Sequence, residues 1–392
     1  MSAYLVRNGV AEYGILIPRN AGEPEKFAAS EFAEAVRKMT GAEMTISDRV
    51  REKFISIGDT EALREAGLSA EMQRIGEGCF GRRVGENLCI AGRTGKGTLY
   101  GVYEYLERAF GYEILGKDLF RFRKKRSLLL GEGDFASVPT FSRRQSTYGE
   151  IRTDPVLCRR MRMETAPEIW AGGNVYHNAF DIAGYGGEDI SPWLSQDGKQ
   201  LCYSNPGLRR TFAKNIRAYL ADPAKCGDRN LMVLGMEDNT DWCDCPACRA
   251  MREKYGSDAA GLLDFVNELS EDLNAERAAQ GKAPMTLVMF AYYATFRAPA
   301  GMQAGKHVGV MLAPILMRFR KSVSAPENEG FRREAESWAK MTKNLFAWTY
   351  NFYTRNSFFT YDTFDEMREL YRFLAGLGVR ILFDQTESYQ PV

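Results

Sequence analysis

The chain has little of what marks a membrane protein or a nucleic-acid-binding protein. No stretch of its 392 residues approaches the ~18–20 consecutive apolar residues that a membrane-spanning helix needs. The formal net charge is only +1, which argues against binding to nucleic acids or membranes by electrostatic attraction. We therefore expect neither kind of partner, and the sequence carries no signal for an oligomeric state.

The first residues also lack a secretory signal. They read MSAYLVRNGVAEYG, with no basic stretch followed by an apolar one. Eight cysteines without an export signal predict a reducing cytoplasm and argue against a disulfide framework. We therefore expect a cytoplasmic protein whose cysteines are free.

Residues 1–137 are predicted to form a smaller α/β accessory domain. Apolar residues at helical spacing predict helices over 25–39 and 97–110, ended by Gly41 and Gly111. Short apolar runs predict strands over 54–57, 87–91 and 112–115. A segment with Gly and Pro follows, and it places the domain boundary near Val138 and Pro139.

Residues 138–392 alternate strand and helix patterns in the way that is typical of a TIM-type (β/α)8 barrel. The strand candidates are 141–147, 169–172, 200–203, 231–235, 285–292, 307–313, 345–350 and 379–383, and the main helices are 208–220, 259–280, 330–341 and 364–377. An open doubly wound sheet is the alternative, although no Gly-rich fingerprint supports it. Only nine residues follow Phe383, so the last barrel helix is predicted to be missing or replaced.

The run LMVLG at 231–235 predicts a buried strand that leads into Glu237 and Asp238. Catalytic groups of α/β barrels collect at the carboxyl ends of strands, and glycoside hydrolysis uses a pair of carboxylates. Neighbours on one strand point apart, so a partner from another strand is expected, and Asp384 and Glu387 are the candidates. The alternative is that Glu237 or Asp238 only caps a turn or orients the loop that follows.

Several aromatic and amide side chains follow other predicted strands. His177 is one of only two histidines and lies in the Gly-rich segment WAGGNVYHNAF, whereas His307 opens a strand and is predicted to be structural. Flat rings and hydrogen-bonding groups are the components of sugar sites. The candidates for contact with a carbohydrate substrate are His177, Asn178, Tyr292, Trp348, Tyr350 and Asn351. A loop-packing role for His177 and a core role for Trp348 are the alternatives.

Three thiols follow the acidic pair, at Cys243, Cys245 and Cys248. This spacing can bring sulfur ligands together in one tight turn, and soft sulfur suits zinc. A tetrahedral site needs a fourth ligand, for which Cys202 and His177 are candidates because both follow predicted strands. A structural zinc site, a metal-free thiol cluster and a redox role remain open, and a catalytic zinc is disfavoured because it would need an open position. No cofactor is expected to be required for the chemistry.

Two parts of the chain resemble known carbohydrate-active families. The segments AASEFAEAVRKMTGAEMTI and AGRTGKGTLYGVYEYLERAFGYEIL resemble the α/β domain that precedes the barrel in α-glucuronidases and β-hexosaminidases. The remainder resembles a barrel domain of unknown function found in bacterial carbohydrate-active proteins. That likeness rests on YHNAFDI, GKQLCYSNPGLRRTF, MVLGMEDNTDWCDCPAC, GLLDFVNELSEDLN, NLFAWTYNF and GVRILFDQTE.

The resemblance implies a glycoside-hydrolase architecture and a function in hydrolysing or binding a glycan. It implies that Asp238 takes the place of the acidic residue before the thiols, and Cys202 that of the cysteine in the QLC motif. Glu237 departs from the amide expected at its position, although the pair is similar to the acidic pair that ends the fourth strand of hexosaminidase barrels. The early end of the chain departs as well, because the family continues into helical segments.

Overall fold

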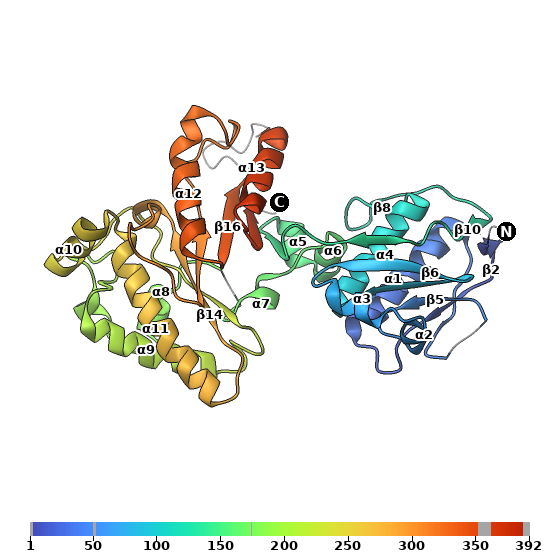
Figure 1. The fold of residues 1–392 in the computed structure, drawn as a ribbon, viewed down its shortest axis with the longest axis horizontal. Coiled ribbons are helices and arrows are strands. Elements are labelled where there is room, and N and C mark those ends of the chain that lie inside the picture. Colours follow the sequence, from blue (N-terminus) through green and yellow to red (C-terminus); the bar gives the residue numbers. More distant parts are fainter. Residues whose placement is uncertain (1–2, 50–51, 174, 352–361, 387–392) are drawn as a thin grey trace. The chain divides into compact units, whose positions relative to one another are not determined.

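A computed structural model describes residues 3–49, 52–173, 175–351 and 362–386. The chain forms two compact units (Figure 1), and the division along the chain falls between Ser142 and Arg143, except that Arg160–Arg162 belong to the first unit. Within the described residues, every helix is too short or too polar to cross a lipid bilayer.

The first unit is built around a mixed six-stranded sheet in the order β11-β6-β7-β5-β3-β4. Strands β4, β3, β5 and β7 run parallel, whereas β6 and β11 are antiparallel to their neighbours. The strands of this sheet are β3 (Gly14–Leu16), β4 (Ile46–Ser47), β5 (Phe54–Ile57), β6 (Cys79–Val84), β7 (Asn87–Gly92) and β11 (Phe135–Ser137). The smaller sheets comprise β1 (Tyr4–Arg7), β2 (Val10–Ala11) and β10 (Leu128–Leu129), and β8 (Glu113–Ile114) with β9 (Phe120–Arg121).

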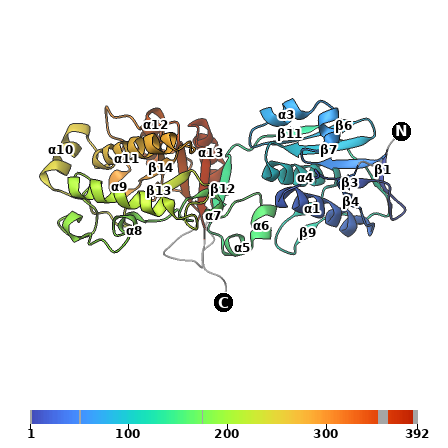
Figure 2. The same cartoon turned by 90° about the horizontal axis from the view of Figure 1, so that it is seen from below.

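Helices cover both faces of this sheet, as Figure 2 shows. The long helices α1 (Glu23–Thr40) and α4 (Gly95–Phe110) cover one face, and the short helices α2 (Glu61–Glu65) and α3 (Ser69–Arg74) cover the other. Successive side chains of β7 point to opposite faces of the sheet. Leu88 and Ile90 pack in the larger core, and Cys89 and Ala91 pack in the smaller one. The predicted helices are confirmed, and each ends at a glycine with positive φ, Gly41 at 79° and Gly111 at 62°.

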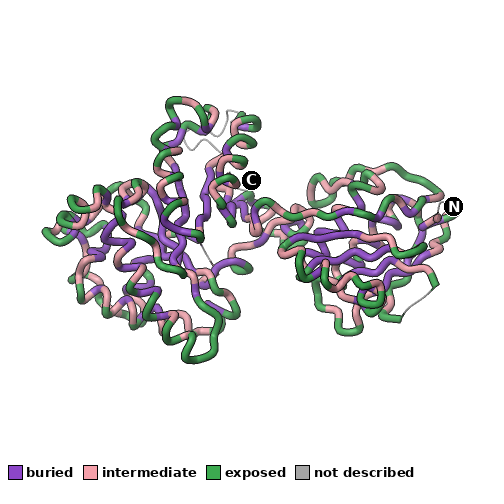
Figure 3. Tube along the Cα trace, viewed as in Figure 1, coloured by how far each residue is buried: buried purple, intermediate pink, exposed green. Residues whose placement is uncertain are grey.

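The second unit contains a six-stranded sheet in the order β12-β17-β16-β15-β14-β13, and all of its strands run parallel. They are β12 (Arg143–Ser146), β13 (Leu231–Leu234), β14 (Thr286–Ala291), β15 (Val308–Leu312), β16 (Leu345–Tyr350) and β17 (Ile381–Gln385). The first and last strands are neighbours, as in a barrel. The central strands are buried along most of their length (Figure 3), which explains their continuous apolar runs.

The long helices of this unit connect and cover the strands. They are α9 (Pro206–Ala221), α10 (Pro246–Tyr255), α11 (Ala259–Ala279), α12 (Glu329–Met341) and α13 (Phe364–Gly376). Short elements are α5 (Gly149–Thr153), α6 (Pro155–Arg160), α7 (Ala166–Ile169) and α8 (Ala179–Ala183), with 3-10 turns η1 (Ser191–Trp193), η2 (Tyr293–Thr295) and η3 (Pro326–Asn328). The four long helices predicted from periodicity are therefore confirmed, and α10 was not predicted.

Two of the eight predicted strands are wrong, and a closed eight-stranded barrel is not confirmed. Residues 169–172 contain the end of α7 and a turn in which Gly172 adopts a φ of 84°, and residues 200–203 contribute only an isolated antiparallel bridge between Leu201 and Leu194. Irregular chain instead lies beside β13. The Ala171 amide donates to Leu231 O at 2.8 Å, and His177 forms a parallel bridge with Gly235.

Candidate functional site

A pocket of about 670 Å³ lies at the carboxyl ends of the parallel strands of the second unit. Its wall is formed by the ends of β14, β16 and β17, by Tyr176 and His177, by Asp238, and by the loop over 313–321 that follows β15. This is the edge of the sheet at which α/β proteins place ligands and catalytic groups. Its volume lies in the ordinary range of small-molecule sites, and the pocket is large enough for a sugar unit.

Asp238 is the carboxylate of this pocket. Its Oδ1 accepts a hydrogen bond from the Tyr292 hydroxyl at 2.7 Å, and its side chain is 64% exposed. Burial, together with the hydrogen bond to Asp238, raises the pKa of Tyr292, so the phenol stays protonated and acts as a donor. The carboxylate is thus fixed in orientation from one side and open to a ligand from the other.

His177 lies beside Asp238 and is partly buried. Its Nδ1 contacts the carbonyl oxygen of Met236, which can only accept, so Nδ1 carries a hydrogen. The other ring nitrogen, Nε2, lies 3.9 Å from Asp238 Oδ1. The ring packs edge-on against Phe290, with centroids 5.7 Å apart, and these contacts hold the imidazole in place at the pocket wall.

Aromatic rings line much of the remaining wall. Trp348 and Tyr350 lie two residues apart on β16 and therefore share one face of the strand. Their rings stack at 29°, with centroids 6.2 Å apart. The Trp348 indole donates to Gln385 Oε1 at 2.8 Å, and Tyr176, which is 41% exposed, meets Trp348 edge-on. Flat apolar faces beside polar groups suit the faces and hydroxyls of a sugar ring.

The loop after β15 adds positive charge to this pocket. Arg318, Arg320 and Lys321 are exposed and belong to its lining, while Phe319 is buried and packs against Tyr350. Among the described lining residues, Asp238 is the one carboxylate. The pocket therefore combines three cations with one anion, which favours a ligand that carries negative charge.

Glu237 lies beside Asp238 in sequence but is not part of the pocket lining. Its Oε1 accepts from the Phe180 amide at 3.4 Å, at the start of α8, and its backbone is held by the side chain of Gln200. Burial raises the pKa of its carboxyl group. The two adjacent carboxylates point to different surroundings, as expected for neighbours in extended chain.

Asp384 does not face the pocket, contrary to the prediction that it would share a rim with Asp238. It accepts from the Thr349 hydroxyl at 2.6 Å and from the amide of Asn351, on the side of the sheet covered by α13. The following residue, Gln385, takes the pocket side because successive residues of a strand alternate faces. Burial raises the pKa of Asp384 to about 6. Asn351 belongs to this network, and Glu387 lies outside the described residues.

Asn178 has a structural position rather than one in the pocket wall. Its amide nitrogen donates to Val233 O at 2.8 Å, and its amide oxygen accepts from Gly235 N at 2.9 Å. The side chain is 7% exposed. Asn178 thus replaces the hydrogen bonds that a neighbouring strand would have supplied to the end of β13.

Of the six side chains predicted to contact a carbohydrate, four line the pocket: His177, Tyr292, Trp348 and Tyr350. Tyr176, Gln385 and the basic loop over 318–321 also line the pocket and were not predicted. Gln385 could have been found by extending the alternation of β17 two residues beyond Phe383. The basic loop, RFRK at 318–321, has no periodic pattern, and only its place after a strand end would have drawn attention to it.

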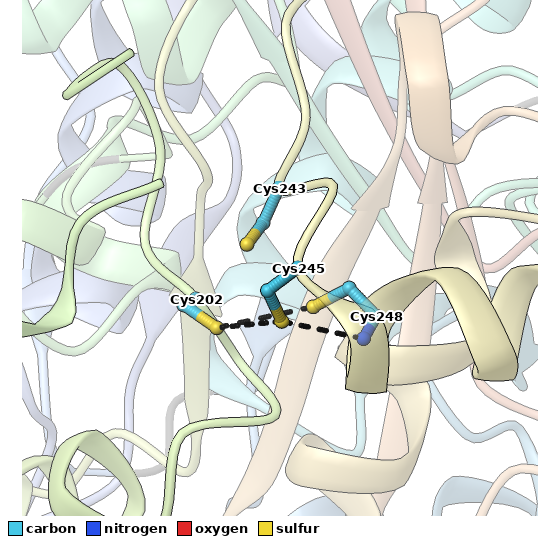
Figure 4. Close-up of side chains that lie close together, drawn as sticks. All are labelled: Cys202, Cys243, Cys245 and Cys248. Atoms are coloured by element: carbon cyan, nitrogen blue, oxygen red, sulfur yellow. Dashed lines mark hydrogen bonds between the residues drawn. The ribbon is translucent and has the colours of Figure 1, made fainter. Parts of the chain in front are cut away.

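The four cysteines predicted to converge do so (Figure 4). The sulfur atoms of Cys202, Cys243, Cys245 and Cys248 lie within 4.8 Å of one another. Cys202 reaches the group from the segment before α9, and the other three come from the loop before α10 and from its first turn. All four are free thiols, and together they could hold a metal ion.

The close sulfurs perturb one another's ionisation. Hydrogen bonds, chiefly from Cys248, lower the pKa of Cys202 to about 4, and the reciprocal interaction raises the pKa of Cys248. Burial raises the pKa of Cys243 to about 12. The cluster therefore favours at least one thiolate at neutral pH.

Comparisons with known proteins agree with this architecture. The family described as Domain of unknown function (DUF4838) matches residues 129–391, and the family described as Glycosyl hydrolase family 67 N-terminus matches residues 12–105. The resemblance inferred from the sequence motifs is thereby confirmed for both parts of the chain.

One curated relative is α-glucuronidase A of Emericella nidulans, which is 30% identical over 102 residues. That match covers 24% of this chain and 12% of the relative, so the chain spans a small part of that protein's length.

Among solved structures, a family GH115 4-O-methyl-α-glucuronidase with specificity for decorated arabinogalactans has a TM-score of 0.54 at 14% identity, over 98% of this chain and 54% of that one. An N-acetyl-β-hexosaminidase of Streptomyces plicatus has a TM-score of 0.53 at 12% identity, over 100% and 83%. These likenesses establish similarity of fold.

Proposed function

The chain belongs to the family described as Domain of unknown function (DUF4838), and we propose that it is a glycosidase whose active site is the pocket around Asp238. The observation that carries this proposal is the environment of that carboxylate. It is open to a ligand, it is oriented by the Tyr292 hydroxyl at 2.7 Å, and it stands at the strand ends among aromatic rings.

Hydrolysis of a glycosidic bond requires a group that activates the attacking water and a proton for the leaving oxygen. We assign the first role to the Asp238 carboxylate, with Tyr292 as the residue that positions it and His177 as the polar neighbour. Trp348 and Tyr350 would hold the sugar ring by stacking. In this step water adds to the anomeric carbon as the glycosidic bond breaks, Asp238 takes a proton from that water, and the leaving oxygen takes a proton from solvent.

We propose that the second unit is a TIM-type barrel with an irregular section. The first and last strands of the unit, β12 and β17, are paired as in a barrel. Beyond β13, the chain over 171–179 is hydrogen-bonded to Leu231 and Gly235. This section would occupy the place of the second and third strands. Because this section is bonded to the end of β13, it places His177 at the same edge of the sheet as Asp238.

We further propose that the substrate is a glycan that contains an acidic sugar such as a uronic acid. Arg318, Arg320 and Lys321 supply positive charge to the pocket lining. Two relatives are α-glucuronidases by name, and glucuronic acid carries a carboxylate. The matched lengths are partial, so this substrate class rests on the charge of the pocket.

The test is hydrolysis of a panel of aryl glycosides and uronic-acid-containing oligosaccharides by the whole chain. Asp238→Asn is expected to reduce kcat by roughly 10²–10⁴-fold, the usual contribution of a positioned general base. Glu237→Gln is the matched control, because Glu237 is adjacent but outside the pocket, and it should keep activity within about tenfold. Equal loss in both variants, or no hydrolysis of any panel member by the unaltered protein, would contradict the proposal.

A second candidate is a carbohydrate-binding protein without turnover. It is favoured by the presence of a single carboxylate in the described lining, since most glycosidases use two. Binding of an acidic oligosaccharide, measured by calorimetry, that survives Asp238→Asn and is never followed by cleavage would support this function instead.

A further inference from the structure

We propose that Cys202, Cys243, Cys245 and Cys248 form a structural site for Zn²⁺. This inference goes beyond the proposed glycosidase activity and stands whether or not the Asp238 pocket is catalytic. It rests on the spacing of the sulfur atoms, on the groups around them and on the burial of the cluster that they form.

The sulfur atoms have the spacing of a tetrahedral site. Zinc–sulfur bonds of about 2.3 Å at tetrahedral angles place neighbouring sulfurs about 3.8 Å apart. The Cys202 sulfur lies 3.7 Å from that of Cys245 and 3.9 Å from that of Cys248, and the Cys243 sulfur completes a group within 4.8 Å. A disulfide would require about 2.0 Å, so the distances fit a shared ion better than a covalent pair.

The surroundings favour thiolates rather than thiols. The Cys248 amide points at the Cys245 sulfur at 3.4 Å, and Cys245 is the N-cap of α10, where the helix dipole favours negative charge. The Ser204 hydroxyl lies 3.0 Å from the Cys248 sulfur and 3.5 Å from that of Cys245. Such donors stabilise metal-bound thiolates, whereas the sulfur of a neutral thiol is only a weak acceptor for them.

The cluster also stands in for a hydrophobic core. Cys202, Cys243 and Cys248 are 8%, 2% and 7% exposed, and with Cys245 they form a packed group of their own, separate from the larger apolar cores. Cys202 lies 43 residues before Cys245, in a segment with little regular structure. An ion bound here would join the two loops at a further point, beside the stacked rings of Tyr203 and Trp242.

Four protein ligands leave no open position on the ion, which assigns it a structural role. A soft divalent ion is required because every donor is sulfur, and zinc suits four thiolates without redox chemistry. Binding displaces the thiol protons to solvent, so affinity should fall as the pH is lowered.

The first test is metal analysis by mass spectrometry of the full chain, purified under reducing conditions from zinc-supplemented cells. We expect about one zinc per chain, and after its removal we expect bound Co²⁺ to show the intense visible absorption of a tetrahedral thiolate site. Zinc below a tenth of an equivalent together with no such Co²⁺ spectrum would overturn the proposal. Iron in place of zinc, or a disulfide among the four cysteines, would overturn it as well.

Variants give a second test that does not depend on activity. Ser204→Ala removes a donor without removing a ligand and should weaken zinc binding by roughly 10- to 100-fold in a chelator competition. Cys243→Ser should release the metal. Cys226→Ser is the matched control, because Cys226 is equally buried and free but outside the cluster, and it should retain one zinc. If Cys243→Ser fails to fold, Ser204→Ala still decides, since unchanged affinity would contradict the assignment.

Discussion

The Tyr292 hydroxyl donates to Asp238 Oδ1 at 2.7 Å, and this bond joins the end of β14 to the loop that follows β13. The donor belongs to a side chain that is 5% exposed, whereas the acceptor is open to solvent. A rigid group therefore orients an accessible one. This is the arrangement that a site needs if a carboxylate is to meet a substrate in a fixed position.

We expect Tyr292→Phe to lower kcat by about 10- to 100-fold, the equivalent of one hydrogen bond to a charged group. KM should change little, because the ring and its packing remain. Steady-state kinetics on the best substrate of the panel separate the two constants. A rise in KM at constant kcat would show that Tyr292 binds substrate directly instead of positioning Asp238.

Asp384 should affect stability rather than activity. Because burial raises its pKa to about 6, the folded chain binds this proton more tightly than the unfolded chain does. Its contribution to the free energy of unfolding is then present below about pH 4 and is lost as the pH rises through about 6. Asp384→Asn stays neutral and should gain about 2–3 kcal/mol relative to the unaltered chain between pH 4 and pH 7.

Denaturant unfolding at several pH values measures this difference, and hydrolysis assays of the same variant test the role of Asp384 directly. Activity within a few-fold of the unaltered protein is expected, because Asp384 faces α13. A loss comparable to that of Asp238→Asn would restore Asp384 as the catalytic partner.

The sequence was sufficient where the pattern reflects burial. The runs at 231–235 and 345–350 lie in strands buried between layers, so their apolar residues continue without interruption and mark β13 and β16 directly. The thiols converge because three of the four lie in one tight turn at the start of α10, where local spacing determines geometry.

Sequence failed where the outcome depends on register or on tertiary contacts. Asp384 and Gln385 are adjacent, so their side chains point to opposite faces of β17, and only Gln385 lines the pocket. A register shift of one residue in β17 would exchange the two. The segments 169–172 and 200–203 are short apolar runs that resemble strands. The first is held instead by the Trp170 indole, which donates to Gln145, and the second by the Gln200 side chain, which donates to Glu237 O; both partners are distant in sequence.

The basic loop should determine preference for charged substrates. Replacing Arg320 and Lys321 together with glutamine is expected to raise KM for an acidic substrate by about tenfold, at the upper end of what exposed charges contribute. A neutral glycoside should be unaffected, and the difference should shrink at high salt. Lys282→Gln is the control, because this exposed lysine lies in the loop before β14, at the other edge of the sheet. Equal effects on acidic and neutral substrates would contradict the proposed substrate class.

Asn178 should be among the most sensitive positions of the second unit. Asn178→Ala leaves the Val233 carbonyl and the Gly235 amide without their partners in a buried setting, and each such loss costs roughly 1–3 kcal/mol. We therefore expect a decrease of about 2–4 kcal/mol in the free energy of unfolding, visible as a lower Tm. Asn230 is exposed and lies directly before β13, so Asn230→Ala should change the free energy of unfolding by no more than about 0.5 kcal/mol. If Asn178→Ala instead left Tm unchanged and abolished carbohydrate binding, Asn178 would be a ligand-contacting residue after all.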